Sequence, residues 1–330
     1  MNEWLRNNLV CPQDKNELEQ NGDQLTCADG HEYSIVDDIP VMLFDDGSPT
    51  HGYITRSLEQ VERVKAGEPL SEVFKYHAAD DSGIDTFVQR EVPYTCGTLY
   101  FSVQHHLPRY PFPEIRLPEG NGRVLLDVGC NWGRWTIPAA QKGFQAFGID
   151  PSLEAVRAAR RVAKQLGAAA GFCVADARYL PFAADSVDLT FSYGVIQHLT
   201  KPNAKASFAE MSRVTKTNGT VVVQMANKYG IRSFYHQVRL GFKDGQEGAD
   251  VFYWTPAELL DTFEKQFGTT QISTDCYFGL GIQKSDADLM PAKYRAIVNA
   301  SEVLRSMSAV ITPLTRVADS VYLESINQRS

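Results

Sequence analysis

The most informative stretch of the sequence is Leu125-Leu126-Asp127-Val128-Gly129-Cys130-Asn131-Trp132-Gly133. This pattern predicts an apolar strand that ends in an acidic residue, followed by a glycine-rich turn into a helix. Glycine adopts positive φ angles at no steric cost, and asparagine tolerates the left-handed region better than most residues. The stretch therefore predicts a tight turn at Gly129, Asn131 and Gly133, where a ligand can approach the backbone.

The spacing of this turn argues against a nicotinamide dinucleotide. Such a cofactor seats its pyrophosphate on the pattern G-x-G-x-x-G. The chain instead has Gly129-x-Asn131-x-Gly133. A glycine-rich turn alone is weak evidence for any one ligand, so the assignment depends on what surrounds it.

Short apolar runs alternate with helical segments after Gly122, which is typical of βαβ units on a parallel sheet. The pattern predicts strands at 123–128, 145–150, 171–174, 187–193 and 220–225. It predicts helices at 132–142, 152–166, 205–214, 229–242 and 255–267. Ser152 is the expected N-cap of its helix. The fold class is therefore α/β.

One acid stands at the end of each of three consecutive predicted strands: Asp127, Asp150 and Asp176. A carboxylate at the end of the second strand can accept hydrogen bonds from both hydroxyls of a ribose. Each acid alone can instead cap the following helix. The ordered trio favours a nucleoside-containing ligand.

Three further segments strengthen this pattern: Leu180-Pro181-Phe182-x-x-Asp185-Ser186-Val187-Asp188, Val195-Ile196-Gln197-His198-Leu199 and Arg213-Val214-x-Lys216-x-Asn218-Gly219-Thr220. With the acids and the turn, they resemble in order the class I S-adenosylmethionine-dependent methyltransferases, and most closely the group that includes ubiquinone and menaquinone biosynthesis methyltransferases. The resemblance covers about residues 123–225. It implies a Rossmann-like fold: a mostly parallel seven-stranded sheet with helices on both faces, finished by antiparallel strands at 269–278 and 320–326.

The resemblance also implies a cofactor site for S-adenosylmethionine. Asp127, Gly129 and Gly133 would surround the methionine part, Asp150 the ribose, Asp176 with Ala177 the adenine edge, and Ser192 with Tyr193 would face the sulfonium. The full predicted cofactor-binding set is Asp127, Gly129, Cys130, Asn131, Trp132, Gly133, Asp150, Pro151, Asp176, Ala177 and Ser192. Asn131 and the Thr217-Asn218-Gly219 turn depart from the usual family pattern.

His198 and Tyr193 are the candidate catalytic residues. Methyl transfer needs proximity and, for a hydroxyl acceptor, a base. His198 follows the fourth strand of the predicted domain and titrates in a range that suits a base. Helix capping or packing is an equally open role for it.

The first 48 residues predict a small β-ribbon domain. Cys11 and Asp14 are three residues apart, and Cys27 and His31 are four apart, which is close to the ligand spacing of metal ribbons. The segment resembles the zinc-ribbon domain that activates, or is fused to, several tRNA and rRNA methyltransferases. Asp14 stands where a second Cys is usual, so we assign no metal ligand. Zinc and a ribbon that folds on its apolar residues alone both remain open.

Three domains are predicted: the ribbon at 1–48, a helical and aromatic connector or lid at 49–122, and the methyltransferase domain at 123–330. The last domain contains a helical insert at about 280–318, with its helix at 292–307. The insert is expected to act either as a lid over the acceptor or as a plain packing helix.

Charge and composition bound the partners. The net charge is −8, from 32 basic and 40 acidic residues, which disfavours nucleic acid because phosphate binding draws on clustered basic side chains. The densest basic stretch, Arg157, Arg160, Arg161 and Lys164, is expected to be a solvated helix face. No apolar run approaches the ~18 residues of a membrane span, and no signal peptide is recognised, so a cytoplasmic protein with reduced thiols is expected.

The acceptor is predicted from two sequence motifs that the chain lacks. The chain has neither an Asn-Pro-Pro-Tyr-like run after the fourth strand of this domain nor a Pro-Cys pair. A hydroxyl on a small molecule or glycan is the expected acceptor, with carbon or a simple amine less favoured. RNA methylation and a catalytically silent, methyltransferase-like partner protein are the alternative functions. The oligomeric state is not predicted.

Overall fold

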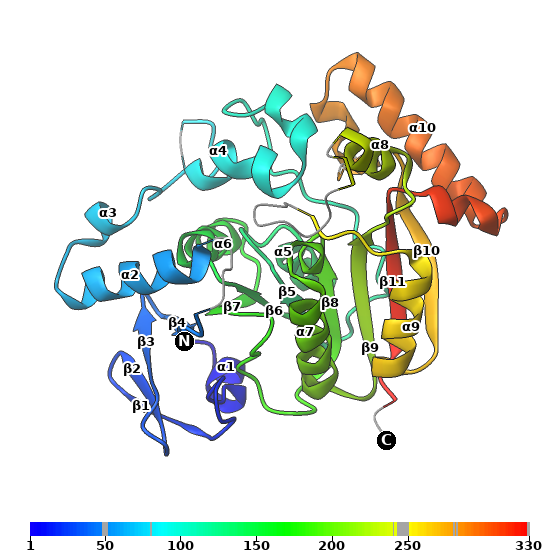
Figure 1. Ribbon diagram of the computed structural model, residues 1–330. Coiled ribbons are helices and arrows are strands. Elements are labelled where there is room, and N and C mark those ends of the chain that lie inside the picture. Colours follow the sequence, from blue (N-terminus) through cyan, green and yellow to red (C-terminus); the bar gives the residue numbers. More distant parts are fainter. Residues whose placement is uncertain are drawn as a thin grey trace.

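The computed structural model describes residues 1–47, 52–79, 81–239, 241–242, 251–279, 281 and 283–328 (Figure 1). Seven strands form the predicted unit: β5 (Val124–Val128), β6 (Gln145–Asp150), β7 (Ala170–Ala175), β8 (Val187–Tyr193), β9 (Thr215–Ala226), β10 (Thr270–Cys276) and β11 (Ser320–Ile326). Their spatial order is β7-β6-β5-β8-β9-β11-β10. The first five run parallel, and β11 is antiparallel to both of its neighbours.

The predicted extent of the sheet is wrong, because the amino-terminal strands join it. These are β1 (Leu18–Asn21), β2 (Gln24–Cys27), β3 (Glu32–Val36) and β4 (Ile39–Met42). Strand β4 pairs in parallel with β7, and the result is one mixed sheet of eleven strands. An edge strand exposes a row of unpaired backbone groups, and β4 pairs with the last two residues of β7, Val174 and Ala175. The ribbon is thus a continuation of the central sheet.

Helices cover both faces, as predicted (Figure 1). The helices α5 (Thr136–Gln141) and α6 (Leu153–Gln165) pack on one face, and α7 (Lys201–Val214) and α9 (Pro256–Phe267) pack on the other. The Ser152 side chain accepts a hydrogen bond from the Ala155 amide, which confirms the expected N-cap of α6. Helix α5 is shorter than predicted because residues 132–135 form turns.

A short helix, α1 (Glu3–Asn8), fills a gap on the face of α7 and α9. The connection between β7 and β8 contains no helix. Trp4 of α1 stacks there on Phe147 of β6, with ring centroids 4.1 Å apart. The amino terminus therefore supplies core packing that the α/β segment after residue 122 lacks.

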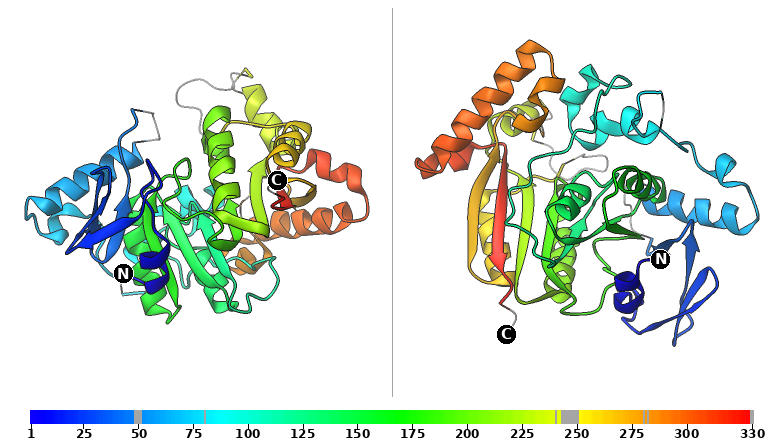
Figure 2. Two further views of the ribbon diagram at one scale, coloured as in Figure 1. Left: turned by 90° about the horizontal axis from the view of Figure 1, so that it is seen from below. Right: turned by 180° about the vertical axis from the view of Figure 1, so that it is seen from behind.

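The remaining helices are α2 (Tyr53–Lys65), α3 (Leu70–Val73), α4 (Thr86–Thr95), η1 (Thr98–Ser102), η2 (Ile196–His198), α8 (Ile231–Arg239), η3 (Lys284–Leu289), α10 (Ala292–Ser308) and η4 (Thr312–Val317). Helix α10 confirms the helix expected in the insert. Figure 2 shows α10 and the amino-terminal strands at opposite ends of the sheet. The boundary at 48/49 and the start of the insert at 280 lie outside the described residues. Among the helices described, none is long and apolar enough to cross a membrane.

The expectation of a solvated basic face on α6 is wrong for its three arginines, whereas Lys164 is exposed as expected. Arg157 and Arg160 both donate to Asp37 in the β3–β4 turn, at 3.3 and 2.9 Å. Arg161 donates to Asp85, the N-cap of α4, at 2.7 Å. Acids of the ribbon and the connector therefore dock on this face, and a pattern read along α6 alone does not reveal them.

Candidate cofactor and acceptor site

The glycine-rich turn after β5 has the predicted backbone. Gly129, Asn131 and Gly133 have φ angles of 85°, 47° and 82°. A Cβ atom on Gly129 would stand 2.2 Å from Cγ2 of Val195. Gly129 is thus required both by its backbone angle and by the close approach of the loop after β8.

Asp127 lies inside β5 and not at its end. Its side chain is buried and accepts a 2.6 Å hydrogen bond from the Thr136 hydroxyl of α5. Burial raises the pKa of Asp127 to about 7. The carboxyl group therefore ties β5 to the start of α5, and contact with methionine remains a prediction.

Asp150 ends β6 and is partly exposed. Its two oxygens accept one backbone hydrogen bond each, from Asn131 at 3.0 Å and from Ser152 at 2.9 Å. A carboxylate offers about four lone-pair positions, so acceptor capacity remains for two hydroxyl donors. Burial raises the pKa of this group to about 6. Asp150 therefore has acceptor capacity of the kind that a ribose diol needs, and its contact with a ribose remains a prediction.

Helix α2 borders the same loop. The Ser57 hydroxyl donates to the carbonyl of Pro151 at 2.7 Å and accepts from the Leu153 amide at 3.0 Å. Burial, together with the negative charge of Asp150, raises the pKa of Tyr53 on α2. The connector thus lies against the loop that carries Asp150.

Asp176 follows β7 and is already occupied. Arg178 makes four hydrogen bonds to its two oxygens, at 2.6–3.2 Å. Arg178 also donates to Asp46, just beyond β4, at 2.9 Å. An adenine amine would have to displace Arg178 to reach this carboxylate, whereas the partly exposed Ala177 is already accessible.

Three predicted site residues turn their side chains into the core. Trp132 is fully buried against the rings of Tyr110 and Phe112, and Cys130 is also buried. Ser192 is buried and donates to the Val128 carbonyl at 2.8 Å. Only their backbones can contribute to a ligand site here.

Tyr193 is held by a buried carboxylate. Its hydroxyl donates to Asp275 at 2.9 Å, and burial raises its pKa well above the usual range. Gln224 and Ser320 donate to the same Asp275 oxygen. Tyr193 is therefore neutral and committed as a donor, which does not suit a base. His198 lies in η2, on the loop after β8, and is partly exposed.

The sequence did not reveal a buried ion pair directly behind the turn. Arg134 donates to Asp286 of η3 at 3.1 Å and to the Tyr100 hydroxyl of η1 at 3.0 Å. Tyr100 in turn donates to Asp286 at 2.5 Å. All three residues are buried. These three residues connect the turn, the connector and the insert. The one signal of this contact in the sequence is that Arg134 directly follows Gly133 of the turn.

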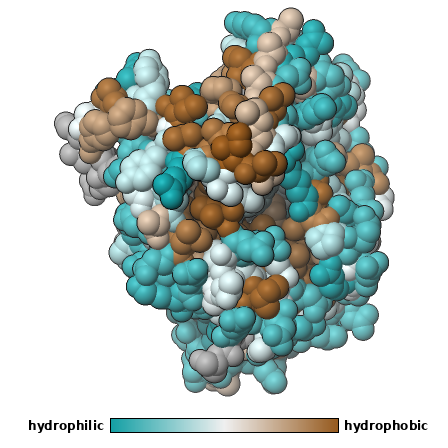
Figure 3. Space-filling model, turned by 90° about the vertical axis from the view of Figure 1, so that its right-hand side faces the viewer, coloured by the Kyte–Doolittle hydropathy of each residue, from teal (hydrophilic) through white to brown (hydrophobic). Residues whose placement is uncertain are grey.

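We call the turn at 129–133 with the loops after β6 and β7 the cofactor side, and Arg134, the end of β8, β10 and the insert the acceptor side, after the roles that the sequence predicts for them. Two hollows lie beside α10. The larger, of about 890 Å³, lies between α10 with its following segment and the residues Glu114, Arg116 and Lys284. The smaller, of about 430 Å³, lies between the end of α10 with its following segment and the sheet face. Figure 3 shows apolar side chains on this face of the molecule. Exposed apolar residues of this segment include Val303, Met307, Val310 and Ile311. The insert therefore covers this face of the sheet incompletely.

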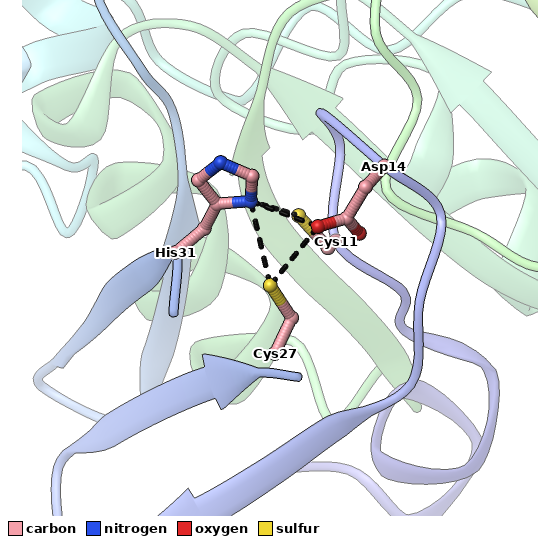
Figure 4. Close-up of side chains that lie close together, drawn as sticks. All are labelled: Cys11, Asp14, Cys27 and His31. Carbon is pink, nitrogen blue, oxygen red and sulfur yellow. Dashed lines mark hydrogen bonds and ion pairs between the residues drawn. The ribbon is translucent and has the colours of Figure 1, made fainter. Parts of the chain in front are cut away.

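The ribbon residues with metal-ligand spacing also come together. Ligand atoms of Cys11, Asp14, Cys27 and His31 all lie within 4.8 Å of one another. Each pair comes from a separate turn, and the four side chains point toward a common centre (Figure 4).

Residues 125–219 match a protein family described as a methyltransferase domain. An uncharacterized methyltransferase of Mycobacterium leprae (strain TN) is 36% identical over 102 residues, which cover 31% of this chain and 36% of that protein. Another, of Mycolicibacterium paratuberculosis (strain ATCC BAA-968 / K-10), is 37% identical over 148 residues, which cover 44% of this chain and 52% of that protein. The chain thus spans about half or less of the length of these relatives.

A solved structure is similar over a longer range. Magnesium protoporphyrin IX methyltransferase from Synechocystis PCC 6803 with bound SAH aligns over 84% of this chain and 97% of that chain, at a TM-score of 0.44 and 14% identity. The family match and the relatives therefore show that residues 125–219 are similar to a methyltransferase domain.

Proposed function

We propose that this protein is an S-adenosylmethionine-dependent methyltransferase whose acceptor is a hydroxyl on a small molecule or glycan. One observation carries the proposal. Within the segment that matches the methyltransferase family, the carboxyl edge of the sheet brings a positive-φ turn beside Asp150, whose carboxylate retains acceptor capacity.

S-adenosylmethionine, when bound, supplies an electrophilic methyl group. The chain's contribution is binding and orientation. Asp150 would accept from the ribose hydroxyls, and the turn from Gly129 to Gly133 would pass the methionine part close to the backbone. Arg178 would move from Asp176, or the adenine would bind to the backbone near Ala177.

In this proposal, His198 removes the proton of the acceptor hydroxyl. His198 lies in η2, on the loop that follows β8. By the family resemblance, side chains of this loop border the acceptor. A histidine titrates near neutral pH, which suits a general base. Tyr193 would serve as a fixed neutral donor, since Asp275 already holds its hydroxyl.

Two features of the chain favour a small-molecule acceptor. The net charge of −8 disfavours a phosphate backbone. The motif order resembles the ubiquinone and menaquinone group, whose acceptors are small molecules. The three-domain organisation at 1–48, 49–122 and 123–330 belongs to the same proposal, with the connector over the cofactor side.

The test is transfer of a labelled methyl group from S-adenosylmethionine, with a metabolite extract and total RNA as separate acceptors. Label in the small-molecule fraction supports the proposal, and label in RNA replaces it with RNA methylation. Calorimetric binding of S-adenosylhomocysteine with no transfer to either acceptor indicates a silent partner protein. Binding of a nicotinamide cofactor in its place would overturn the cofactor assignment.

A further inference from the structure

Two turns of the amino-terminal ribbon present four metal-ligating atoms to one point. The first turn carries Cys11 and Asp14, and the second, which joins β2 to β3, has Cys27 at its start and His31 at its end. The two sulfur atoms, a carboxylate oxygen and an imidazole nitrogen face one another in Figure 4. The thiol groups belong to buried residues.

The distances between these atoms resemble the edges of a coordination tetrahedron. Nδ1 of His31 lies 3.5 Å from Sγ of Cys11, 3.4 Å from Sγ of Cys27 and 2.9 Å from Oδ2 of Asp14. The Cys27 sulfur lies 3.1 Å from the same carboxylate oxygen. Zinc bonds of about 2.0–2.3 Å at tetrahedral angles give edges of about 3.3–3.8 Å. Slight relaxation around an ion would bring the four atoms to that geometry.

Hydrogen bonding accounts for only some of the close approaches at Nδ1 of His31. Nδ1 of His31 lies within 3.5 Å of two sulfur atoms and one oxygen. An imidazole nitrogen has either one hydrogen or one lone pair, so it can serve only one of these three partners. A single cation at the centre gives all four atoms the same partner.

Neighbouring groups hold the ligands in place. The Asn16 amide donates to Oδ1 of Asp14 at 2.8 Å, which leaves Oδ2 facing the centre. Gln13 donates to the Tyr33 hydroxyl at 2.9 Å, so the hydroxyl hydrogen is left for the Cys11 sulfur, 3.1 Å away. Such supporting hydrogen bonds orient metal ligands and stabilise a thiolate.

We propose that Cys11, Asp14, Cys27 and His31 bind one zinc ion. Two thiolates and an imidazole favour zinc over the hard cations, which prefer oxygen ligands. Four protein ligands leave no open position, so the site is structural and not catalytic.

The ion would join two parts of the ribbon that contact the rest of the protein differently. The first turn is fixed to the β7–β8 connection, where the Val10 amide donates to the Pro181 carbonyl at 3.0 Å. Lys15 also reaches Glu210 of α7 at 2.8 Å. The second turn belongs to the β-strands that continue through β4 into the central sheet. Zinc would therefore link the packing of the amino terminus to the edge of the sheet.

The experiment measures metal content and thermal unfolding of the full chain purified under reducing conditions. We expect one zinc per chain, and a cobalt-substituted sample with the visible absorption of a tetrahedral site and a sulfur-to-metal charge-transfer band. Cys27→Ser and His31→Ala should lose most of the metal, whereas Asp14→Cys should retain it. Asp29→Asn, a change in the same turn outside the cluster, is the matched control and should keep one zinc.

A chelator should lower the unfolding temperature of the wild type and of Asp29→Asn, and zinc should restore it. Metal-free wild type that neither takes up zinc nor gains stability from it would overturn the proposal. So would zinc content that stays unchanged in a Cys11→Ser/Cys27→Ser double variant, or a Cys11–Cys27 disulfide in the reduced preparation. Folding of each variant is checked independently by circular dichroism.

Discussion

The contacts of the cofactor side join residues that are near one another in the sequence, whereas those of the acceptor side join residues that are far apart in it. On the cofactor side, the Asn131 amide bonds to Asp150 only 19 positions away. On the acceptor side, Arg134 bonds to Asp286 across 152 positions, and Tyr193 bonds to Asp275 across 82. A motif read along the chain captures the first kind of contact. The second kind is made by charges that meet only after folding.

The two sides also differ in what their acids do. Asp150 is partly exposed, and its carboxylate can accept further hydrogen bonds. Asp286 and Asp275 are buried, and each is surrounded by donors from other segments. The cofactor side therefore has an acid available for a ligand, whereas the acids of the acceptor side organise the protein around the site.

The largest expected effect is on the acceptor side. Asp286→Ala leaves Arg134 buried without its carboxylate, which costs about 3–5 kcal/mol of unfolding free energy. Asp288→Ala is the control, since its pair with Arg109 is exposed and worth at most about 1 kcal/mol. Urea unfolding of both variants measures the difference. Equal, small losses would mean that the ion pair does not organise this side.

The next prediction concerns turnover. If His198 removes the acceptor's proton, His198→Ala lowers kcat by at least about a hundredfold while the Kd of the cofactor barely changes. His106→Ala, an exposed histidine of the connector, should leave both quantities unchanged. A structural role for His198 would instead show as parallel losses of stability and of cofactor affinity. Near-normal turnover in folded His198→Ala removes this residue from the mechanism.

A third prediction compares two acids of the cofactor side. Asp150→Ala should weaken cofactor binding by about 1–3 kcal/mol, roughly 5- to 150-fold in Kd, because hydroxyl donors lose their acceptor. Asp176→Ala should cost less affinity and more stability, since Arg178 already occupies Asp176. Calorimetry and thermal unfolding of the two variants separate these effects. The reverse order would place Asp176 at the adenine despite Arg178.

The sequence predicted the methyltransferase strands and the positive-φ turn because hydrophobic period and backbone preference are local properties. Strands β6, β8 and β11 have the predicted bounds. It did not predict that β4 would extend the sheet, because pairing of β4 with β7 depends on an open strand edge and not on residue type. The basic face of α6 was misread for a similar reason. Asp37 and Asp85, which lie in other segments, determine whether that face is solvated.

The smallest and most specific effect is the pH dependence of cofactor binding. Burial raises the pKa of Asp150 to about 6, and ribose hydroxyls need the charged form as acceptor. As the pH falls through 6, the carboxyl group takes up a proton, and Kd for S-adenosylhomocysteine should rise by up to about tenfold per pH unit. Asp150→Asn should bind weakly and show a flat profile between pH 5 and pH 7.

The contribution of Asp150 to folding stability does not explain the weaker cofactor binding at low pH. The pKa of Asp150 in the folded protein lies above its ordinary value of 3.8, so the native state binds the extra proton between these two values. Its contribution to stability is therefore greatest at low pH and falls as the pH rises from about 4 to about 6. Affinity and this part of the stability thus move in opposite directions with pH, and calorimetry beside thermal unfolding at each pH tells them apart. If Asp150→Asn retained the pH dependence, Asp127, whose pKa is about 7, would be the titrating group.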